Sequence, residues 1–144
     1  MKDIFRCNCP ITSALDLIGD RWSLVIIKQI LFEAKSTFKD FTESNEGIAT
    51  GILSSRLKML EEFGLLGKKK LPGNRKSNFY YLTDKGLSLT PLLIELSLWS
   101  RDHLQEIHPN LNLHEALSTV EKNKKKACEQ IITQYKKGLQ QPVP

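Results

Sequence analysis

The stretch from Gly47 to Leu66 separates its apolar and polar residues onto opposite sides of a helix. On a helical wheel turning about 100° per residue, one arc is apolar and is formed by Ile52, Leu53, Leu57, Met59, Leu60 and Phe63. The opposite arc is formed by Thr50, Gly51, Ser54, Ser55 and Lys58. A solvated helix face would carry salt-bridged Glu and Lys, whereas a small, hydrogen-bonding face with a cation suits a helix in the major groove of DNA. An ordinary amphipathic helix without this purpose is the alternative.

The length of 144 residues fits one domain, with room for an appended terminal element. The net charge of +5 permits nucleic-acid binding without requiring it. No apolar run approaches the roughly 18 residues of a membrane span, and the first seven residues lack the apolar core of a signal peptide. Three cysteines, an odd number, argue against a secreted disulfide framework. We therefore expect a cytoplasmic protein with no membrane partner, whose thiols stay reduced unless they are sensors.

Helical segments precede this stretch. Pro10 fits the first turn of a helix that stops near Gly19, and Asp20 can cap a second helix from Arg21 to Glu33. The second helix has a core pattern formed by Trp22, Val25, Ile26, Ile30 and Leu31. Ser36 or Thr37 can cap a short third helix whose Phe38 and Phe41 face inward, and residues 44–47 form a turn. This order is a helix-turn-helix, and the helix after the turn has the recognition position.

A basic hairpin is expected directly after the recognition helix, which Gly64 ends. Residues 65–71 and 78–82 read as strands, and residues 72–77 read as the turn between them. Five cations lie on the first strand and the tip: Lys68, Lys69, Lys70, Arg75 and Lys76. A hairpin of this kind is the wing of a winged helix, and its tip would contact DNA phosphates. Edge protection is the alternative, and it fits the three lysines of the strand better than Arg75 and Lys76.

Two further helices are expected towards the C-terminus. The first runs from Thr83 to about His103, with Pro91 bending or restarting it. Its apolar surface and that of the first helix exceed what a small monomer exposes, so we predict a dimer built from residues 11–18 and 92–104. The second lies within residues 110–138, and Asn112 with Glu115 resembles a capping box at its start. A disordered tail is expected at 139–144. The dimer interface is predicted to include Ile11, Leu15, Ile18, Leu92, Leu93, Leu96 and Trp99.

Cys9 is the best candidate for a reactive thiol, because it lies at a helix N-terminus with Arg6 nearby. Cys7 could act as a resolving thiol, although a Cys-x-Cys pair is strained as an internal disulfide. The alternative for Cys9 is a small residue that merely occupies the cap. Cys128 lies within or beside an apolar stripe, so we expect it to be a core residue.

Residues 9–104 resemble the HxlR-type (MarR-like) winged-helix transcriptional regulators of bacteria. The resemblance is carried by Gly-Asp-Arg-Trp at 19–22 and Leu-Thr-Asp-Lys-Gly at 82–86, in the right order and spacing, and by the segments 9–10, 15–24, 47–50, 53–65 and 91–93. It implies a mostly α fold with a small β-hairpin wing (α+β), with residues 1–9 as an arm and 10–104 as the DNA-binding domain with its dimerisation helices. It also implies a homodimer on a pseudo-palindromic operator in double-stranded DNA, and no catalytic centre. Several members sense electrophiles and oxidants through a cysteine just before the proline of helix one, a position that Cys9 matches.

The resemblance and the helical wheel together predict the DNA-binding residues. Two positions depart from the family pattern: Gly51 stands where a polar residue is common, and Ala49 stands where Ser is a frequent cap. Arg56 lies inside the apolar arc, so we expect it to pair with a carboxylate such as Asp40 or with a backbone carbonyl. The predicted DNA-binding residues are Ser36, Thr37, Lys39, Thr50, Gly51, Ser54, Ser55, Lys58, Asn74, Arg75 and Lys76.

Other functions are less consistent with the sequence. No Ser-His-Asp set, P-loop or glycine fingerprint is present, so we expect no enzyme and no cofactor. A zinc site from Cys7, Cys9 and histidines would have an unusual spacing, and the three histidines follow at positions 103, 108 and 114. Two alternatives within the fold stay open. One is a regulator whose inducer is a small molecule bound between the dimer helices, and the other is a winged helix used only for protein–protein contact.

Overall fold

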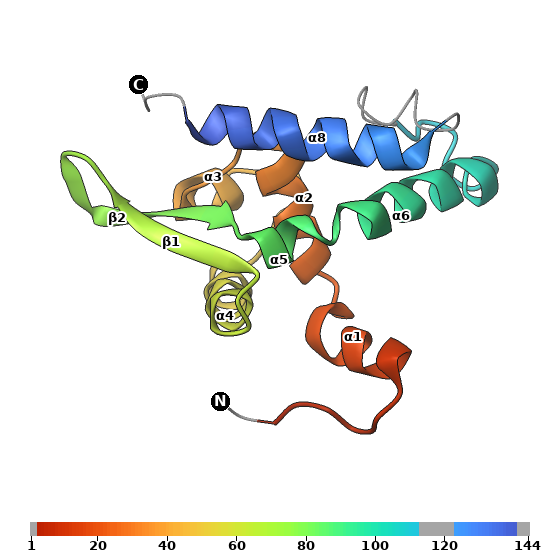
Figure 1. Ribbon diagram of the computed structural model, residues 1–144, viewed down its shortest axis with the longest axis horizontal. Helices are drawn as coiled ribbons and strands as arrows, with labels where there is room; N and C mark the ends of the chain where they lie inside the picture. Colours follow the sequence, from red (N-terminus) through yellow and green to blue (C-terminus); the bar gives the residue numbers. More distant parts are fainter. Residues whose placement is uncertain (1–2, 113–122, 141–144) are drawn as a thin grey trace. The chain divides into compact units, whose positions relative to one another are not determined.

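The computed structural model describes residues 3–112 and 123–140 of the chain (Figure 1). The chain forms two compact units, Met1–Gly86 and Leu87–Pro144, and each is described by itself. The division falls inside the segment 10–104 that the sequence presents as one domain. The described part is mostly helical with one two-stranded antiparallel hairpin, which confirms the expected fold class. In that part of the chain, no helix is long and apolar enough to cross a membrane.

The first unit contains the helix-turn-helix and the hairpin. Its elements are α1 (Pro10–Ile18), α2 (Ser23–Glu33), α3 (Phe38–Thr42), α4 (Thr50–Glu62), β1 (Leu66–Leu71), β2 (Asn74–Leu82) and the start of α5 (Asp84–Leu87). Helix α2 begins two residues later than expected, because the Asp20 carboxylate accepts the backbone N–H groups of Trp22 and Ser23 (2.9 and 3.0 Å) and so caps the helix from outside it.

Three helices and the base of the hairpin enclose the core of this unit. Helix α4 packs against α3 and β1, and β2 packs against α2 and α3. The most deeply buried apolar side chains are aliphatic with one aromatic: Ile26, Ile27, Ile30, Phe41, Leu53, Leu57, Leu60, Leu65, Leu66 and Leu82. Trp22 and Val25, expected in this core, are only half-buried. Phe38, expected to face inward, is exposed. It is the first residue of a five-residue helix, and Phe41 alone supplies that helix's fully buried aromatic side chain.

A tight junction joins α4 to the hairpin and to α5. Gly64 ends α4 with a φ of 80°, a backbone conformation that favours glycine. Thr83 then donates its hydroxyl to the Leu65 carbonyl at 3.1 Å and accepts the Gly86 N–H at 3.1 Å. Gly86 is buried so closely that an added Cβ would lie 3.1 Å from Leu82 Cδ2 and would overlap the Leu65 carbonyl oxygen. This junction sets the direction in which the hairpin leaves the unit.

The second unit contains α6 (Thr90–His103) and α8 (Lys124–Leu139), which pack against each other. The chain does restart at Pro91, which lies in the first turn of α6, so the helix expected from Thr83 is two helices. Lys124 pairs with Glu95 of α6 at 2.7 Å, and Ala127 and Ile131 are the buried residues of α8. Residues 113–122, on which the expected start of the last helix falls, lie outside the described residues, as do 141–144 of the expected tail. Leu139, assigned to that tail, belongs to α8.

Candidate DNA-binding surface

Helix α4 presents the small polar face that the sequence predicts. Thr50, Gly51, Ser54, Ser55 and Lys58 are all exposed, whereas only Leu53, Leu57 and Leu60 of this helix are buried. Lys58 forms no ion pair with a described residue, so its charge is available to a ligand. The space around Gly51 is open, since an added Cβ would meet nothing within 4 Å. The helix begins at Thr50, with Ala49 as an N-cap that lacks a side-chain hydrogen bond.

The apolar arc of α4 is narrower than the helical wheel indicates. Ile52, expected in that arc, is 42% exposed, and Met59 and Phe63 are half-buried. Three leucines, each spaced three or four residues from the next, are sufficient to anchor the helix on the core. Ile52 therefore belongs to the accessible surface near the start of α4, and it is a residue that the sequence-based prediction missed.

An ion-pair cluster holds the turn before α4 against α2. Lys28 of α2 pairs with Glu33 at 2.7 Å and with Glu46 of the turn, and Gln29 donates to the same Glu46 carboxylate at 3.3 Å. Burial alone would lower the pKa of the Lys28 ammonium, but the two carboxylates outweigh it and raise that pKa. Lys28 thus stays charged and links α2 to the turn that precedes α4.

Arg56 has a structural role, but with a different partner from the expected one. Its Nε lies 3.5 Å from the Asp20 carboxylate, and its Nη1 lies 3.5 Å from the Met59 sulfur. Asp40, the carboxylate named from the sequence, instead closes the capping box of α3. The side chain of Arg56 thereby ties α4 to the loop that caps α2.

The segment before α3 uses its polar groups within the protein. The Thr37 hydroxyl accepts the Asp40 N–H at 3.2 Å, and the Asp40 carboxylate accepts the N–H groups of Ser36 and Thr37 at 3.0 Å each. The Ser36 carbonyl accepts the Tyr80 N–H of β2 at 2.7 Å, which fixes the hairpin to this segment. Ser36 and Thr37, predicted to contact DNA, therefore lie beside the hairpin, but they already form hydrogen bonds within the protein.

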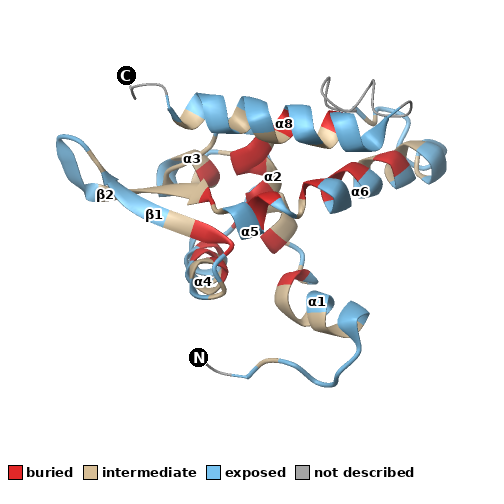
Figure 2. Ribbon diagram, viewed as in Figure 1, coloured by how far each residue is buried: buried red, intermediate tan, exposed pale blue. Residues whose placement is uncertain are grey.

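The hairpin tip differs from the six-residue turn that the sequence suggests. The two-residue loop Pro72-Gly73 connects Leu71 to Asn74, and Gly73 has a φ of 79°. Lys70 pairs with Asn78 while Leu71 pairs with Asn74, so the register shifts and residues 75–77 form a bulge on β2. The bulge contains Arg75 and Lys76, and Figure 2 shows that the tip is exposed whereas the hairpin base is buried.

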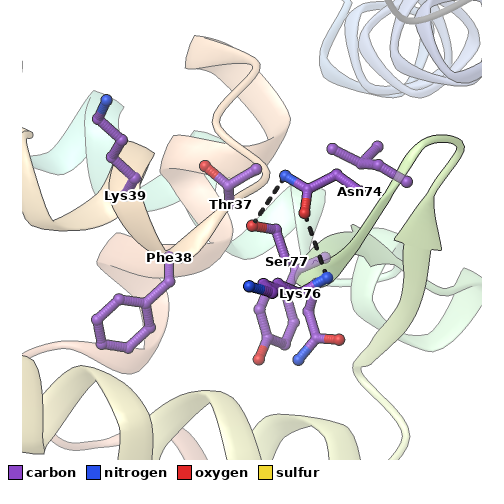
Figure 3. Close-up of a pocket in the computed structure, with 9 residues that line it drawn as sticks. Thr37, Phe38, Lys39, Asn74, Lys76 and Ser77 are labelled. Carbon is purple, nitrogen blue, oxygen red and sulfur yellow. Dashed lines mark hydrogen bonds between the residues drawn. The ribbon is translucent and has the colours of Figure 1, made fainter.

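Asn74 braces this bulge. Its side-chain amide donates to the Ser77 hydroxyl at 3.3 Å, and its carbonyl oxygen accepts the Lys76 N–H at 3.2 Å, as the dashed lines in Figure 3 mark. Asn74 thus holds the segment that carries Arg75 and Lys76. This use explains an asparagine at a position that the sequence placed among the direct DNA contacts.

The cations of the hairpin divide into paired and unpaired ones. Lys68 lies 3.4 Å from Glu61, and the Lys69 ammonium lies 5.1 Å from the centre of the Phe79 ring. Arg75 and Lys76 form no ion pair with a described residue. The two charges at the tip are thus left for an external anion.

A pocket of about 460 Å³ lies between α3 and the hairpin (Figure 3). Thr37, Phe38 and Lys39 line it from the α3 side, and Lys76 and Tyr80 are among the residues that line it from β2. Lys39 is exposed and only loosely paired with Glu43, at 3.9 Å. The pocket joins the predicted contacts of the α3 segment to those of the hairpin and places cations on both of its sides.

Cys9 is the N-cap of α1 and is exposed. The backbone N–H and the hydroxyl of Thr12, together with the Ile11 N–H, lower the pKa of the Cys9 thiol below its usual value. Arg6, invoked from the sequence, is instead paired with Asp16 at 2.7 Å. Burial raises the pKa of the Cys128 thiol, and Cys128 is half-buried, so the pKa shifts of the two thiols have opposite directions.

The arm before Cys9 contacts α1 and the end of α4. Phe5 lies edge-on to Phe63, with the ring centres 6.4 Å apart, and Arg6 also donates its backbone N–H to Asp16 at 3.0 Å. The Ser13 hydroxyl donates to the Cys7 carbonyl at 3.3 Å. The exposed Cys7 and Cys9 thus lie on a segment that contacts both α1 and Phe63, the residue that follows α4.

The residues predicted for a dimer interface divide into two groups. Ile11 and Leu15 of α1 are 73% and 56% exposed, and Leu92, Leu96 and Trp99 of α6 are also exposed. Ile18 and Leu93 are buried within one chain, so they differ from the other five residues, and their place in an interface stays a prediction.

No group of His, Cys, Asp or Glu in the described part of the chain could hold a metal ion. His103 packs on Trp99 with ring centres 5.3 Å apart, and His108 is exposed. His114 lies outside the described residues.

Two capping carboxylates predict how stability depends on pH. Burial of Asp20 and Asp40 works against their ionisation, but hydrogen bonds from neighbouring N–H and hydroxyl groups outweigh it and lower both pKa values. A lowered folded-state pKa stabilises the protein above the unfolded value of about 4, and this stability is lost as the pH falls through the folded pKa. Urea unfolding at a series of pH values between 7 and 2 measures this effect. The unfolding free energy of the Asp20→Asn, Asp40→Asn double variant should fall less steeply with decreasing pH than that of the parent. Identical pH dependence in the two proteins would contradict the stabilising role of the two carboxylates.

Taken together, the helix-turn-helix, the exposed polar face of α4 and the cationic hairpin define a winged helix-turn-helix DNA-binding protein. The model of the HxlR-like helix-turn-helix family matches residues 17–108, and the chain belongs to this family. It is a family of transcriptional regulators, so the chain is a regulator and not an enzyme.

Individual relatives agree with this assignment. The HTH-type transcriptional regulator YodB of Bacillus subtilis (strain 168) is 34% identical over 93 residues, which are 64% of this chain and 82% of YodB. The structure of PA1607 is similar with a TM-score of 0.62 at 33% identity, covering 75% of this chain and 72% of PA1607. YodB itself has been solved in a reduced form (TM-score 0.55, 31% identity, 73% and 100% of the two chains) and after diamide treatment (0.52, 31%, 68% and 97%).

Proposed function

We propose that the chain binds a pseudo-palindromic operator as a homodimer, with α4 of each protomer in a major groove. The observation that carries this proposal is the exposed face of α4, on which small hydroxyls lie beside Lys58, and Lys58 forms no ion pair with a described residue. Ser54, Ser55 and Lys58 are the proposed readers of base edges. Thr50 and Gly51 lie in the first turn, which is the part of a recognition helix that reaches the bases.

The hairpin and the α3 segment supply the proposed phosphate contacts. Arg75 and Lys76 lie at the exposed tip, and Lys39 lies across the pocket from Lys76. A DNA strand that passes between α3 and the hairpin would meet cations on both sides, which is the arrangement that phosphates favour.

Dimerisation is supported by the apolar side chains that each unit leaves exposed. Ile11 and Leu15 are exposed on α1, and Trp99 of α6 is 56% exposed. Large apolar side chains gathered on one helix face usually mark an interface. A two-fold dimer carries two recognition helices and therefore calls for a pseudo-palindromic operator.

The proposal is tested with DNA from upstream of the gene that encodes the chain. Gel retardation and footprinting at low salt should give one protected site with two related half-sites. Sedimentation should give a dimer that binds one duplex. Failure to retard the fragment even at low salt would contradict the proposal.

We further propose that Cys9 makes DNA binding responsive to oxidants or electrophiles. The lowered thiol pKa and the exposure of Cys9 support this proposal, as does the likeness to YodB, which has been solved both reduced and diamide-treated. The thiolate could add to a quinone, or two thiols could give two electrons and two protons to diamide and form a disulfide. The arm and its Phe5–Phe63 contact offer a path from Cys9 to α4.

Replacing Cys9 by Ser should abolish the response of operator binding to diamide and to a quinone. Serine keeps the size of the side chain but cannot be oxidised or alkylated at neutral pH. Fluorescence anisotropy with a labelled operator, before and after treatment, measures the effect. Cys128→Ser is the matched control and should respond as the parent does, because its pKa is raised. A Cys9→Ser protein that still responds would eliminate this role.

A further inference from the structure

Ile52 is an exposed aliphatic residue in the first turn of the proposed recognition helix. It is 42% exposed, while the buried leucines of the same helix, Leu53, Leu57 and Leu60, are each at most 2% exposed. Its side chain is therefore not among the fully buried ones of the core. Its accessibility on α4 needs another explanation.

The surroundings of Ile52 narrow the choice of partner. Gly51 precedes it and leaves open space around its own Cα, and Ser55 lies one turn further along and is exposed. Among the exposed residues from Thr50 to Ser54, Ile52 thus has the largest side chain. The unpaired Lys58 makes the neighbouring face attractive to an anion and not to an apolar protein surface.

The major groove of DNA offers one apolar group that fits this position. Base edges there carry hydrogen-bond donors and acceptors, and the only methyl group is the C5-methyl of thymine. The N-terminal residues of a recognition helix are the ones that reach base edges. The hydroxyls and the lysine of the polar face of α4 can read donors and acceptors, whereas Ile52, at the edge of that face, cannot.

We propose that Ile52 is a specificity-determining residue that contacts a thymine methyl group in each half-site. This inference rests on the proposed function, because α4 must enter the major groove. Burial of one methyl group corresponds to about a fourfold change in affinity. Two symmetric half-sites would multiply this to roughly fifteenfold for the dimer.

The test replaces each thymine of the footprinted operator by deoxyuridine, in both half-sites together. Deoxyuridine lacks only the methyl group and pairs as thymine does. With the parent protein, deoxyuridine at one or two symmetric positions should lower the affinity about fifteenfold, as measured by anisotropy. The Ile52→Ala variant should bind the thymine operator about as weakly and should show no further decrease in affinity when uracil is placed at those positions.

Two control variants isolate the contact. Lys58→Ala should bind more weakly but remain sensitive to uracil substitution, because it removes a different interaction. Ile107→Ala removes an isoleucine that is 81% exposed and outside α4, and it should behave as the parent does. Thermal unfolding of Ile52→Ala should match that of the parent, since the core is not touched.

The outcomes separate this inference from the proposed function. If the parent binds the operator but no thymine position responds to uracil, or if Ile52→Ala keeps the response, the inference is wrong and the proposed function stands. If Ile52→Ala dissociates the dimer in sedimentation, Ile52 belongs to an interface between copies and the inference is also wrong. If the parent binds no upstream DNA, both fail.

Discussion

Replacing Lys58, Arg75 and Lys76 together by Ala is expected to lower operator affinity by at least about a hundredfold at 0.1 M salt. These cations are exposed and have no ion-pair partner among the described residues, so they can each replace a counterion of the DNA. The slope of log affinity against log salt should fall by about 0.9 for each phosphate that the variant no longer neutralises. Because a dimer carries each cation twice, the total decrease should be about 5. Anisotropy titrations at four salt concentrations measure both quantities.

The matched control removes the same charge from another helix. Lys124, Lys125 and Lys126 lie in the first turn of α8, and their replacement by Ala changes the net charge equally. That variant should keep an affinity and a salt slope near those of the parent. Equal decreases in the two triple variants would mean that net charge and not the proposed surface controls binding. An unchanged slope in the first variant would remove Lys58, Arg75 and Lys76 from the site.

The Gly86→Ala variant is expected to lose about 2–3 kcal/mol of unfolding free energy. The added Cβ would overlap the Leu65 carbonyl oxygen and approach Leu82 Cδ2 to 3.1 Å. Backbone cannot rotate away as a flexible side chain can, so either β1 or α5 must move. The hydrogen bond between the Gly86 N–H and Thr83, at 3.1 Å, would be strained by this movement. Urea titration followed by circular dichroism should show a lower midpoint.

Gly51→Ala is the control for this second prediction. Its Cβ would meet nothing within 4 Å, and alanine gains up to about 1 kcal/mol over glycine in a helix. Its unfolding midpoint should therefore equal or exceed that of the parent. If Gly86→Ala were as stable as the parent, the close packing at the hairpin base would not be a constraint on the fold.

The elements of the fold could be predicted where local signals determine them. Thr37 with Asp40 forms a capping box, Gly64 ends α4, and Pro91 restarts a helix, and each of these signals acts within a few residues. The alternation of apolar and polar residues likewise located the hairpin strands to within a few residues. These features together were enough for the winged-helix architecture.

The parts that could not be predicted depend on residues distant in the sequence. The partner of Arg56 is Asp20 and not Asp40, because the choice between two carboxylates is made by tertiary packing. The bulge at residues 75–77 arises from pairing between β1 and β2, and composition alone described it as a turn. Ile18 and Leu93 illustrate the same limit, because an apolar helix position can face its own core or a second copy. The helical wheel likewise assigned Ile52 to the core because it ranks residues by angle and not by the space available.

Gly51 has a consequence for how such a regulator can acquire new targets. Most residues that reach a ligand are held by neighbours, so changing them disturbs the fold as well as the binding. Around Gly51 there is free space on the outer side of α4, and almost any other residue would favour the helix more than glycine does. A single base change in the gene can therefore add a side chain here without lowering the stability of the fold. Position 51 is thus a place where descendants of this protein could diverge in operator preference while their fold stays the same.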